Sequence, residues 1–174
     1  MVGEGGSTSN PDDIEVSVCA PTVLTVPDWN RIEFILREGK AVNVRSALNE
    51  IPISARLALA RHGGAIVGLG AIKRARAWYA EETRKHAKYD FDASMDELGY
   101  VAVDADFQGR RLSSRIVDAL LDGYSLSLFA TTDDEKMKGL LGHRGFKHAG
   151  KSWTGNRGEL SLWLLDRRNY VARG

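Results

Sequence analysis

Hydrophobic and polar residues alternate along the chain with two periods, and each period predicts one type of element. Over residues 14–18 the apolar positions recur at every second residue, which is typical of a half-buried strand. From Pro27 to Glu38 the apolar positions fall on one helical face and Gly39 follows them, so we expect a helix there. Residues 42–54 fit neither period well, and we expect a short helix within them.

A tight turn is expected at Gly63–Gly64, between two apolar runs of which the second ends at Ile72. The charged stretch 73–88 follows and consists mostly of helix formers. The same patterns then predict strand 98–103, turn 104–109, helix 112–120, strand 125–130, helix 135–143, and strands 147–153 and 159–165. Because strands alternate with helices and hairpins in this order, the expected fold class is a mixed α/β or α+β sheet.

Length and composition restrict the class of protein. The chain has 174 residues, of which 43% are hydrophobic and 27% charged, and this fits one globular domain at residues 13–174 after a polar, disordered tail at 1–12. The net charge of +1 argues against a protein that coats nucleic acid or a membrane. Cys19 is the single cysteine, so no internal disulfide forms. Without a membrane-length apolar run or a signal-peptide pattern, a cytoplasmic protein is expected.

The stretch from Glu97 to Ile116 combines a strand, a tight polar turn and the start of an amphipathic helix. The first turn of a helix exposes unpaired N–H groups and the positive end of the helix dipole, which suit a phosphate or diphosphate. Gly109 allows the backbone to approach a ligand, and Arg110 and Arg111 add positive charge. An ordinary strand-to-helix crossover with solvated arginines explains the same pattern, and both interpretations stay open at this point.

This stretch resembles the signature of the GNAT superfamily of acyl-CoA-dependent N-acyltransferases, Arg/Gln-x-x-Gly-x-Gly/Ala with a strand valine five residues before it. Val103 and Gln108 match the valine and the first position of the signature. The segment Asp134-x-x-Met137-x-x-Leu-Leu-x-x-x-Gly-Phe is similar to the family's Asn-x-x-Ala-x-x-Leu-Tyr-x-x-x-Gly-Phe. Residues 64–73 are similar to the family's central hairpin strand, and the resemblance extends from Ile14 to Asp166.

Four positions depart from the family pattern. Arg111 stands where the signature has glycine, and Ser113 stands where it has glycine or alanine. The side chain of Arg111 either crowds the diphosphate or contacts it. Leu141 replaces the tyrosine that often protonates the departing thiolate, and Asp134 replaces the asparagine.

The resemblance implies a GNAT fold, with a splayed central mixed sheet of about six to seven strands flanked by helices. It also implies acetyl-CoA, or another acyl-CoA, as co-substrate: the coenzyme strand pairs with the pantetheine arm, and the following turn and helix start hold the diphosphate. A backbone N–H near Tyr100 and Val101 then stabilises the oxyanion. The residues implied in coenzyme binding are Val101, Ala102, Val103, Gln108, Gly109, Arg110, Arg111, Leu112, Ser113, Ser114, Asp134 and Met137.

Two residues are candidates for acid–base chemistry. Glu97 lies six positions before Val103, where histone-type members of the superfamily carry their catalytic glutamate, and a carboxylate there can take a proton from the amine. The alternative is a strand-end glutamate that faces water or pairs with an arginine. Tyr100 is the candidate proton donor to the thiolate, but strand alternation places it on the face opposite to Glu97 unless a bulge intervenes.

The resemblance implies that the acceptor approaches over the early helices and the connection before the coenzyme strand. Trp29, Trp78 and Tyr79 are the aromatic residues expected to contact it. Residues 73–88 carry six basic and two acidic residues, so a nucleic acid or another polyanionic acceptor also fits there. A solvated charged helix whose aromatic residues cover the core explains the same composition.

Three hypotheses on function remain. The first is an N-acyltransferase that moves an acetyl or other acyl group from coenzyme A to a primary amine by direct attack in a ternary complex, with Glu97 as general base. The second is a nucleic-acid-directed acyltransferase, or a non-catalytic module that binds coenzyme or nucleic acid. The third is an unrelated α/β protein. The expected acceptor is a small-molecule amine, a protein amino group or a modified nucleic acid; no membrane or metal is expected, and the chain is expected to be a monomer or homodimer.

Overall fold

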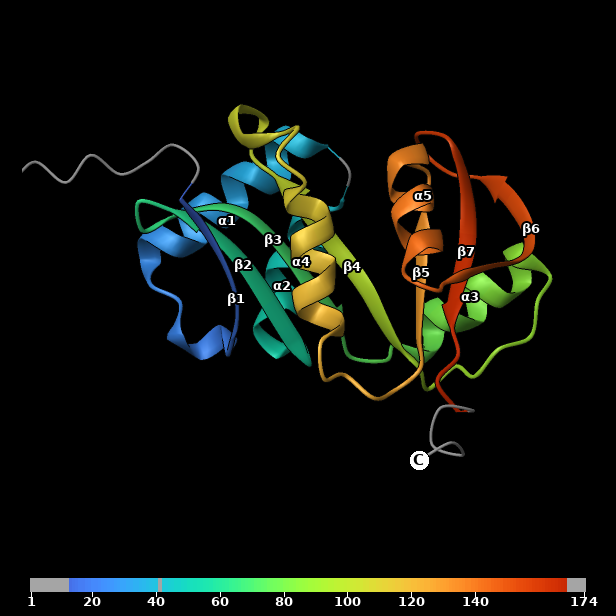
Figure 1. Cartoon of the computed structure of the whole chain (residues 1–174). Helices are drawn as coiled ribbons and strands as arrows, with labels where there is room; N and C mark the ends of the chain where they lie inside the picture. The colour runs from blue at the N-terminus through green and yellow to red at the C-terminus, as the bar shows by residue number, and fades with distance from the viewer. Residues whose placement is uncertain (1–12, 41, 169–174) are drawn as a thin grey trace, which may run out of the picture.

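The computed structural model describes residues 13–40 and 42–168. The disordered tail predicted for residues 1–12 lies outside the described residues, and the single domain predicted for residues 13–174 stays a prediction. Figure 1 shows one central sheet with helices packed against it. Within the described residues, no helix combines the length and the hydropathy needed to cross a membrane.

Seven strands form one mixed sheet in the order β1-β2-β3-β4-β5-β7-β6. The strands are β1 (Ile14–Cys19), β2 (Arg56–His62), β3 (Ala65–Lys73), β4 (Asp96–Val103), β5 (Leu128–Thr132), β6 (Lys147–Thr154) and β7 (Glu159–Leu165). The α-helices are α1 (Val26–Gly39), α2 (Val44–Glu50), α3 (Ala77–Ala87), α4 (Leu112–Leu121) and α5 (Glu135–His143). Three short 3-10 helices are η1 (Pro21–Val23), η2 (Ile51–Ile53) and η3 (Ala105–Phe107). The mixed α/β class and the order of its elements are thus confirmed.

One strand begins later than its sequence pattern predicts. The strand expected at residues 125–130 starts at Leu128, and the apolar side chain of Leu126 is exposed before it. The hydroxyl of Ser127 accepts a hydrogen bond from the backbone N–H of Arg167 at 2.9 Å. The segment therefore forms a loop that a side-chain hydrogen bond joins to the residues after β7. The strand was predicted too early because Leu126 is apolar.

The sheet consists of two arms that meet between β4 and β5. Strands β1 to β4 pair antiparallel in the first arm, and β5, β7 and β6 pair antiparallel in the second. β4 and β5 run parallel and pair only through Asp96 with Leu128 and Glu97 with Phe129. Beyond these residues the two strands diverge, as Figure 1 shows, and this divergence is the splay implied by the resemblance.

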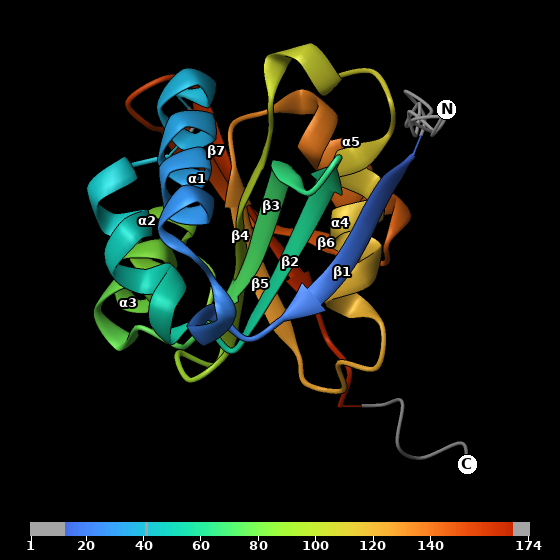
Figure 2. The ribbon, with the colours of Figure 1, turned by 90° about the vertical axis from the view of Figure 1, so that its left-hand side faces the viewer.

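Helices cover both faces of the sheet. Figure 2 shows α4 and α5 on one side, which we name the α4 face, and α1, α2 and α3 on the other, which we name the α1 face. Because β4 and β5 are parallel, their C-terminal ends lie at the same edge of the sheet. The chain continues from these two ends into α4 and α5, so both helices begin near that edge.

The buried core is divided by the sheet and by the splay. On the α4 face, apolar residues of α4 such as Ile116 and Leu120 pack against β2 and β3. On the α1 face, one cluster lies beneath α1 and includes Ile32, and a separate cluster lies beneath α3 and includes Phe129. These two clusters belong to different arms of the sheet. A side chain on the α1 face at the β4–β5 junction therefore lies between two cores rather than inside one.

Candidate active site

A β-bulge interrupts β4 shortly after Glu97. Gly70 of β3 stands opposite two residues of β4, Tyr100 and Val101, where regular pairing has one. Tyr100 has a φ of 55°, in the left-handed region that few residues other than glycine adopt. The bulge brings the Tyr100 side chain to the α1 face, where it joins the core beneath α1, and turns Val101 toward the α4 face.

The bulge decides how Tyr100 lies relative to Glu97. Strict alternation places the two side chains on opposite faces of the strand. The extra residue shifts the phase, and a chain of contacts joins the two side chains on the α1 face, as described below. The face that strict alternation assigns to Tyr100 is therefore wrong. The sequence prediction made an exception for an intervening bulge, and this exception applies here.

The edge of β4 that faces β5 has no strand partner after Glu97. The parallel ladder with β5 ends there, while the opposite edge of β4 continues to pair with β3. Val101, Ala102 and Val103, which the resemblance implies in pantetheine binding, are half-buried on this stretch. An extended ligand can add to such an edge through main-chain hydrogen bonds, as an extra strand does.

The turn between β4 and α4 presents backbone N–H groups to its surroundings. Gln108 donates its own backbone N–H to the carbonyl of Ala105 at 3.5 Å. Among the described residues, no hydrogen-bond acceptor is found for the backbone N–H groups of Gly109, Arg111, Leu112, Ser113 and Ser114. Leu112 is buried and anchors the helix, whereas Ser113 and Ser114 are half-buried. These N–H groups and the dipole of the ten-residue helix α4 suit an anion.

Backbone conformation explains the glycine that the family signature has at position 111. Gly109 and Arg111 have φ values of 79° and 57°, both in the left-handed region. This conformation is free of steric cost for glycine and costs another residue about 1–2 kcal/mol. Arg111 is the N-cap of α4 and its side chain is exposed, while the guanidinium of Arg110 lies 5.2 Å from the centroid of the Phe107 ring.

Asp134 and Met137 lie at the start of α5. Asp134 is the N-cap, and its carboxylate accepts a hydrogen bond from the backbone N–H of Lys136 at 3.0 Å. Asparagine, which the family pattern has there, caps a helix equally well, so this departure leaves the helix start intact. Met137 is half-buried and packs against the core of the α4 face. Both residues therefore lie on the face and near the edge of the sheet where α4 also begins.

Glu97 is buried on the α1 face between two cations. The residue is 4% exposed. The Nζ of Lys73 lies 2.8 Å from Oε1 of Glu97, and the Nη2 of Arg76 lies 3.0 Å from Oε2. The two cations compensate the charge of a carboxylate that has little contact with water. The alternative drawn from the sequence, a glutamate that pairs with an arginine, describes the contacts of Glu97 in this structure. The role of Glu97 as a base stays a prediction.

The contacts of Glu97 extend to α2 through Arg76. The Nη1 of Arg76 lies 2.5 Å from Oε1 of Glu50, and the Tyr100 hydroxyl donates a hydrogen bond to Oε2 of Glu50. The Nζ of Lys73 also lies 4.4 Å from the centroid of the Tyr100 ring. We name these five residues, Glu50, Lys73, Arg76, Glu97 and Tyr100, the junction network, because they connect α2, β3 and β4 with the start of α3 at the β4–β5 junction.

The junction network changes the acidity of Tyr100. Burial raises the pKa of Tyr100 above its usual value, and the hydrogen bond to Glu50 and the negative charge of that residue raise it further. A phenol that holds its proton more tightly is a weaker acid toward a thiolate. The geometry therefore favours a hydrogen-bonding role for Tyr100, and the proton transfer predicted for it remains untested.

Two of the three aromatic residues predicted to bind the acceptor lie beside the junction network. The Tyr79 hydroxyl is 2.8 Å from Oγ1 of Thr131 on β5, its ring centroid is 4.5 Å from the guanidinium carbon of Arg76, and burial raises its pKa. Trp78 is 65% exposed, with its ring centroid 5.4 Å from the same carbon. Trp29 lies on α1, packed against the core beneath that helix.

The basic stretch 73–88 does not form a continuous exposed surface. Lys73 and Arg76 belong to the junction network, where both contact carboxylates. Two further bases pair with nearby acids, Arg84 with Glu81 and Asp90, and Lys85 with Glu82. This arrangement agrees better with a charged helix that compensates its own charges than with a surface for nucleic acid.

Sequence reasoning did not bring Glu50, Lys73 and Arg76 together in one site. A weak signal was present, because Lys73 ends an apolar strand and Arg76 follows it closely. Glu50 gave no signal, since its position depends on how α2 packs against the sheet. Side chains from separate elements meet only through tertiary packing, and spacing along the chain does not reveal such a meeting.

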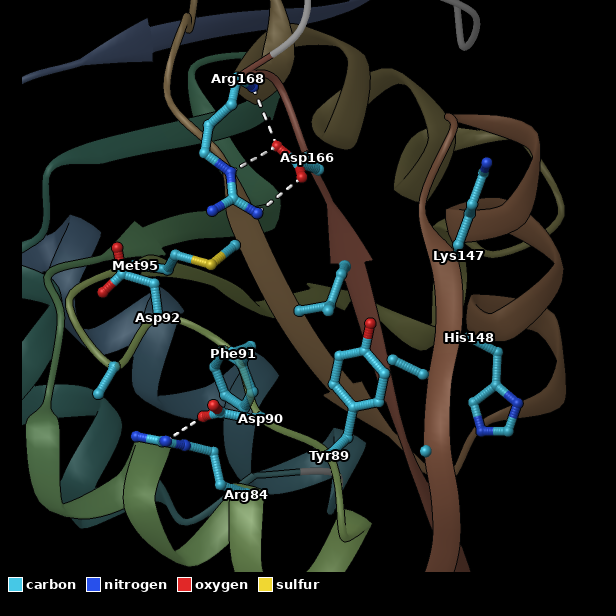
Figure 3. A pocket seen from close by; sticks show the side chains of 14 residues that line it. Arg84, Tyr89, Asp90, Phe91, Asp92, Met95, Lys147, His148, Asp166 and Arg168 are labelled. Carbon is cyan, nitrogen blue, oxygen red and sulfur yellow. Dashed lines mark hydrogen bonds and ion pairs between the residues drawn. The ribbon is translucent and has the colours of Figure 1, made fainter.

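A separate pocket of about 930 Å³ lies between the α3–β4 connection, β6 and the end of β7 (Figure 3). Two ion pairs lie at it, Arg84 with Asp90 and Arg168 with Asp166. None of the predicted site residues lines it, so it is not part of the candidate acyl-transfer site. Among the residues that the structure describes, no group of three or more His, Cys, Asp and Glu side chains could hold a metal ion.

The arrangement of the sheet is shared with solved structures. The protein yncA of Salmonella typhimurium, solved with its cofactor acetyl-CoA, matches with a TM-score of 0.66 and 15% identity over 90% of this chain and 95% of that chain. A GNAT-family acetyltransferase from Streptococcus agalactiae gives 0.66 and 11%, over 88% and 96%. The ribosomal-protein-alanine N-acetyltransferase from Brucella melitensis gives 0.63 and 13%, over 87% and 99%. The chain has the GNAT fold.

The GNAT fold confirms the resemblance that the sequence motifs indicated, at the level of structure. No protein-family model matches the sequence, and no curated protein matches it either. At identities this low, structural similarity establishes the architecture alone. The parts of this GNAT fold that bear on its chemistry are the bulge of β4, its unpaired edge and the start of α4.

Proposed function

We propose that this protein is an N-acetyltransferase of the GNAT superfamily, which transfers an acetyl group from acetyl-CoA to a primary amine in a ternary complex. The observation that carries the proposal is the unpaired edge of β4, which runs from the bulge toward the start of α4, where backbone N–H groups lack acceptors among the described residues. A buried carboxylate, Glu97, lies on the α1 face at the beginning of the same edge. These features together suit an extended ligand with a diphosphate at one end and a reactive carbonyl at the other.

Acetyl-CoA is the co-substrate that we propose for this edge. The diphosphate binds to the backbone N–H groups of residues 109–114, with Arg110 and Arg111 as sources of positive charge. The pantetheine arm pairs with Val101, Ala102 and Val103, whose strand has no neighbour on that side. The acetyl-CoA complex of the Salmonella typhimurium protein supports this choice.

Transfer then proceeds by direct attack of the amine. The amine nitrogen forms a C–N bond with the thioester carbonyl carbon, and the C–S bond breaks. A backbone N–H of the Tyr100–Val101 bulge, where regular pairing with β3 is interrupted, stabilises the oxyanion. Glu97 takes the proton that the nitrogen loses, directly or through a water molecule, and coenzyme A leaves as a thiolate that takes up a proton.

The acceptor that we propose is a small-molecule amine or a protein amino group that reaches the junction from the α1 face. Tyr79 and Trp78 lie beside the junction network on that face. The ring of Trp78 is 65% exposed, so an acceptor can contact it. The Brucella melitensis neighbour carries the name of a protein N-acetyltransferase, which supports including protein amines.

Glu97→Gln tests the proposed base. We expect kcat to fall by about 10²–10⁴-fold while the dissociation constant of acetyl-CoA changes by less than about twofold, because the carboxylate acts on the amine. Thiol release from acetyl-CoA, measured across primary amines and amino-terminal peptides, gives the rate, and calorimetry gives the affinity. Glu33→Gln is the control, since Glu33 pairs with Arg37 on the exposed side of α1.

Glu97→Gln also leaves the buried Lys73 without its carboxylate partner and removes one of the two carboxylate contacts of Arg76, which costs stability. If that variant fails to fold, Lys73→Met/Glu97→Gln is compared with Lys73→Met, so that both proteins lack the lysine. Equal rates in that pair would remove Glu97 from the mechanism. Absence of thiol release with every amine, together with no binding of acetyl-CoA, would overturn the proposed function itself.

A further inference from the structure

Glu50 joins the base and the bulge, although it belongs to a different element from either. One carboxylate oxygen receives the Tyr100 hydroxyl and the other contacts Arg76, whose second nitrogen contacts Glu97. Its side chain is 19% exposed, and that of Arg76 is 20% exposed. A single carboxylate on the last turn of α2 therefore contacts Tyr100 of the bulge directly and is connected to Glu97 through Arg76.

The bulge needs such a contact because its conformation is unfavourable in itself. A non-glycine residue in the left-handed region is strained and persists only where its surroundings hold it. The surroundings of Tyr100 are the hydrogen bond to Glu50, the ammonium group of Lys73 over its ring and the core beneath α1. Of these, the hydrogen bond is the directional contact that fixes the position of the side chain.

We propose that Glu50 is a positioning residue, which fixes the β4 bulge through the Tyr100 hydroxyl and the orientation of Glu97 through Arg76. This inference rests on the proposed function, because positioning matters to the rate only if the bulge N–H and Glu97 act on substrates. Glu50 and Arg76 belong to α2 and the start of α3, which lie on the same side of the sheet (Figure 2). The two helices that border the junction on the α1 face are thereby connected to the reaction centre.

The expected kinetic signature is non-additive. Removing both partners of the Tyr100–Glu50 hydrogen bond should lower kcat no more than removing one partner does. Glu50→Met and Tyr100→Phe should each lower kcat by about tenfold, because a small displacement of the oxyanion donor raises the barrier. The KM for acetyl-CoA should stay within about twofold, since Ala102, Val103 and residues 109–114 lie outside the bulge and remain in place. The double variant should be no slower than the slower single variant, because both substitutions remove the same bond.

Tyr124→Phe is the matched control. The Tyr124 hydroxyl likewise donates to a carboxylate at 2.7 Å, but its acceptor is Oδ2 of Asp96, which lies on β4 outside the bulge. We expect this variant to keep the kcat of the unmodified protein. If Tyr124→Phe lowers kcat as much as Tyr100→Phe does, the loss of any tyrosine–carboxylate hydrogen bond that involves β4 is enough to lower kcat. The proposal is then overturned.

Arg76 provides a readout that a purely structural role would not move. The groups that face Glu97 are Lys73 from β3, Arg76 from the start of α3, Tyr79 from α3 and Tyr100 from β4, with Glu50 of α2 behind Arg76. Arg76→Met removes the contact that orients Glu97 and should lower kcat while the KM for acetyl-CoA stays within about twofold. Arg76→Lys keeps a cation at this position and should restore part of the lost kcat.

Amide hydrogen exchange tests the proposal without reference to the reaction. Exchange over residues 98–101 should be faster in Glu50→Met and Tyr100→Phe than in the unmodified protein, and unchanged in Tyr124→Phe. If the unmodified protein transfers acetyl groups and both variants match it in kcat and exchange, the positioning role is overturned and the proposed function stands. If the unmodified protein transfers none, the proposed function fails, and the role of Glu50 in catalysis fails with it.

Discussion

Tyr100 and Arg111 hold left-handed backbone conformations without being glycine, and they flank the segment that we propose binds acetyl-CoA. Tyr100 begins the unpaired stretch of β4, and Arg111 ends the turn before α4. Residues in such strained conformations often cluster at ligand-binding sites, where the surrounding structure holds the backbone in that conformation. The conformations of Tyr100 and Arg111 therefore agree with the proposed site.

Asp28 gives a prediction on the dependence of stability on pH. Its carboxylate accepts a hydrogen bond from Arg61 at 2.8 Å and forms a capping box with Thr25 at the start of α1. The bond to Arg61, together with those to Thr25, lowers the pKa of Asp28 to about 2. Because the folded pKa lies below the unfolded value of about 3.9, this stabilisation is present above about pH 4 and is lost as the pH falls toward 2.

Between about pH 4.5 and 2.5, we expect the free energy of unfolding of the unmodified protein to fall by about 1–2 kcal/mol more than that of Asp28→Asn. Urea unfolding at the two pH values measures the difference. Asp118→Asn, which removes the exposed ion pair with Arg144, serves as the control and should behave as the unmodified protein does. Equal pH dependence in Asp28→Asn and the unmodified protein would show that Asp28 does not carry the effect.

At the scale of elements, the position of α4 depends on how closely the helix approaches β3. A Cβ atom at Gly70 would lie 2.7 Å from Cγ2 of Ile116, 3.1 Å from Cδ1 of Leu120 and 3.2 Å from Cγ2 of Val101. Glycine at this position allows the helix and the bulged strand to pack on the same spot of β3. The start of α4, where we propose the diphosphate binds, is therefore placed by a contact within the core.

Gly70→Ala should lower the free energy of unfolding by about 1–3 kcal/mol, because the added methyl group forces α4 away from the sheet. The same displacement should weaken acetyl-CoA binding. Denaturant unfolding and calorimetry measure the two effects. Gly139→Ala on α5, where a Cβ meets no atom within 4 Å, is the control and should not destabilise the protein. A Gly70→Ala variant as stable as the unmodified protein would contradict this account of α4 packing.

At the scale of the whole molecule, few contacts join the two arms of the sheet where they diverge. β4 and β5 share two residue pairs. The β6–β7 turn adds a second connection, because Arg157 donates a hydrogen bond to the carbonyl of Lys40 at the end of α1 and lies 3.5 Å from Asp133 after β5. A ligand that inserts between β4 and β5 adds contacts to both arms, so its binding should stabilise the molecule as a whole.

Acetyl-CoA at about 100 times its dissociation constant should stabilise the native state by about 2.7 kcal/mol and raise Tm by about 5–10 °C. ATP, which has phosphates but no pantetheine arm, should raise Tm less at the same concentration. Differential scanning calorimetry measures both shifts. An unchanged Tm with acetyl-CoA would contradict binding along β4, and equal shifts with the two ligands would restrict the contact to the start of α4.

Local patterns determined most of the fold and part of the candidate site. The alternation in β1, the apolar runs of β2 and β3 and the amphipathic face of α4 each report which side chains are buried, and burial decides the type of element. The motif around Val103 and Gln108 indicated the helix start because free N–H groups follow from the order strand, turn, helix. These properties depend on near neighbours along the chain, and the sequence contains them.

Tertiary structure decided the face that Tyr100 occupies, the contacts of Glu97 and the inclusion of Glu50 in the junction network. A bulge depends on the register between two strands, and register is set by the packing of both faces of the sheet. The junction network joins side chains from β3, β4 and α2 with the start of α3, elements whose relative positions no local pattern encodes. Long-range packing selects one arrangement among many that the same elements allow, and for this reason the chemical surroundings of Glu97 became visible only in the folded chain.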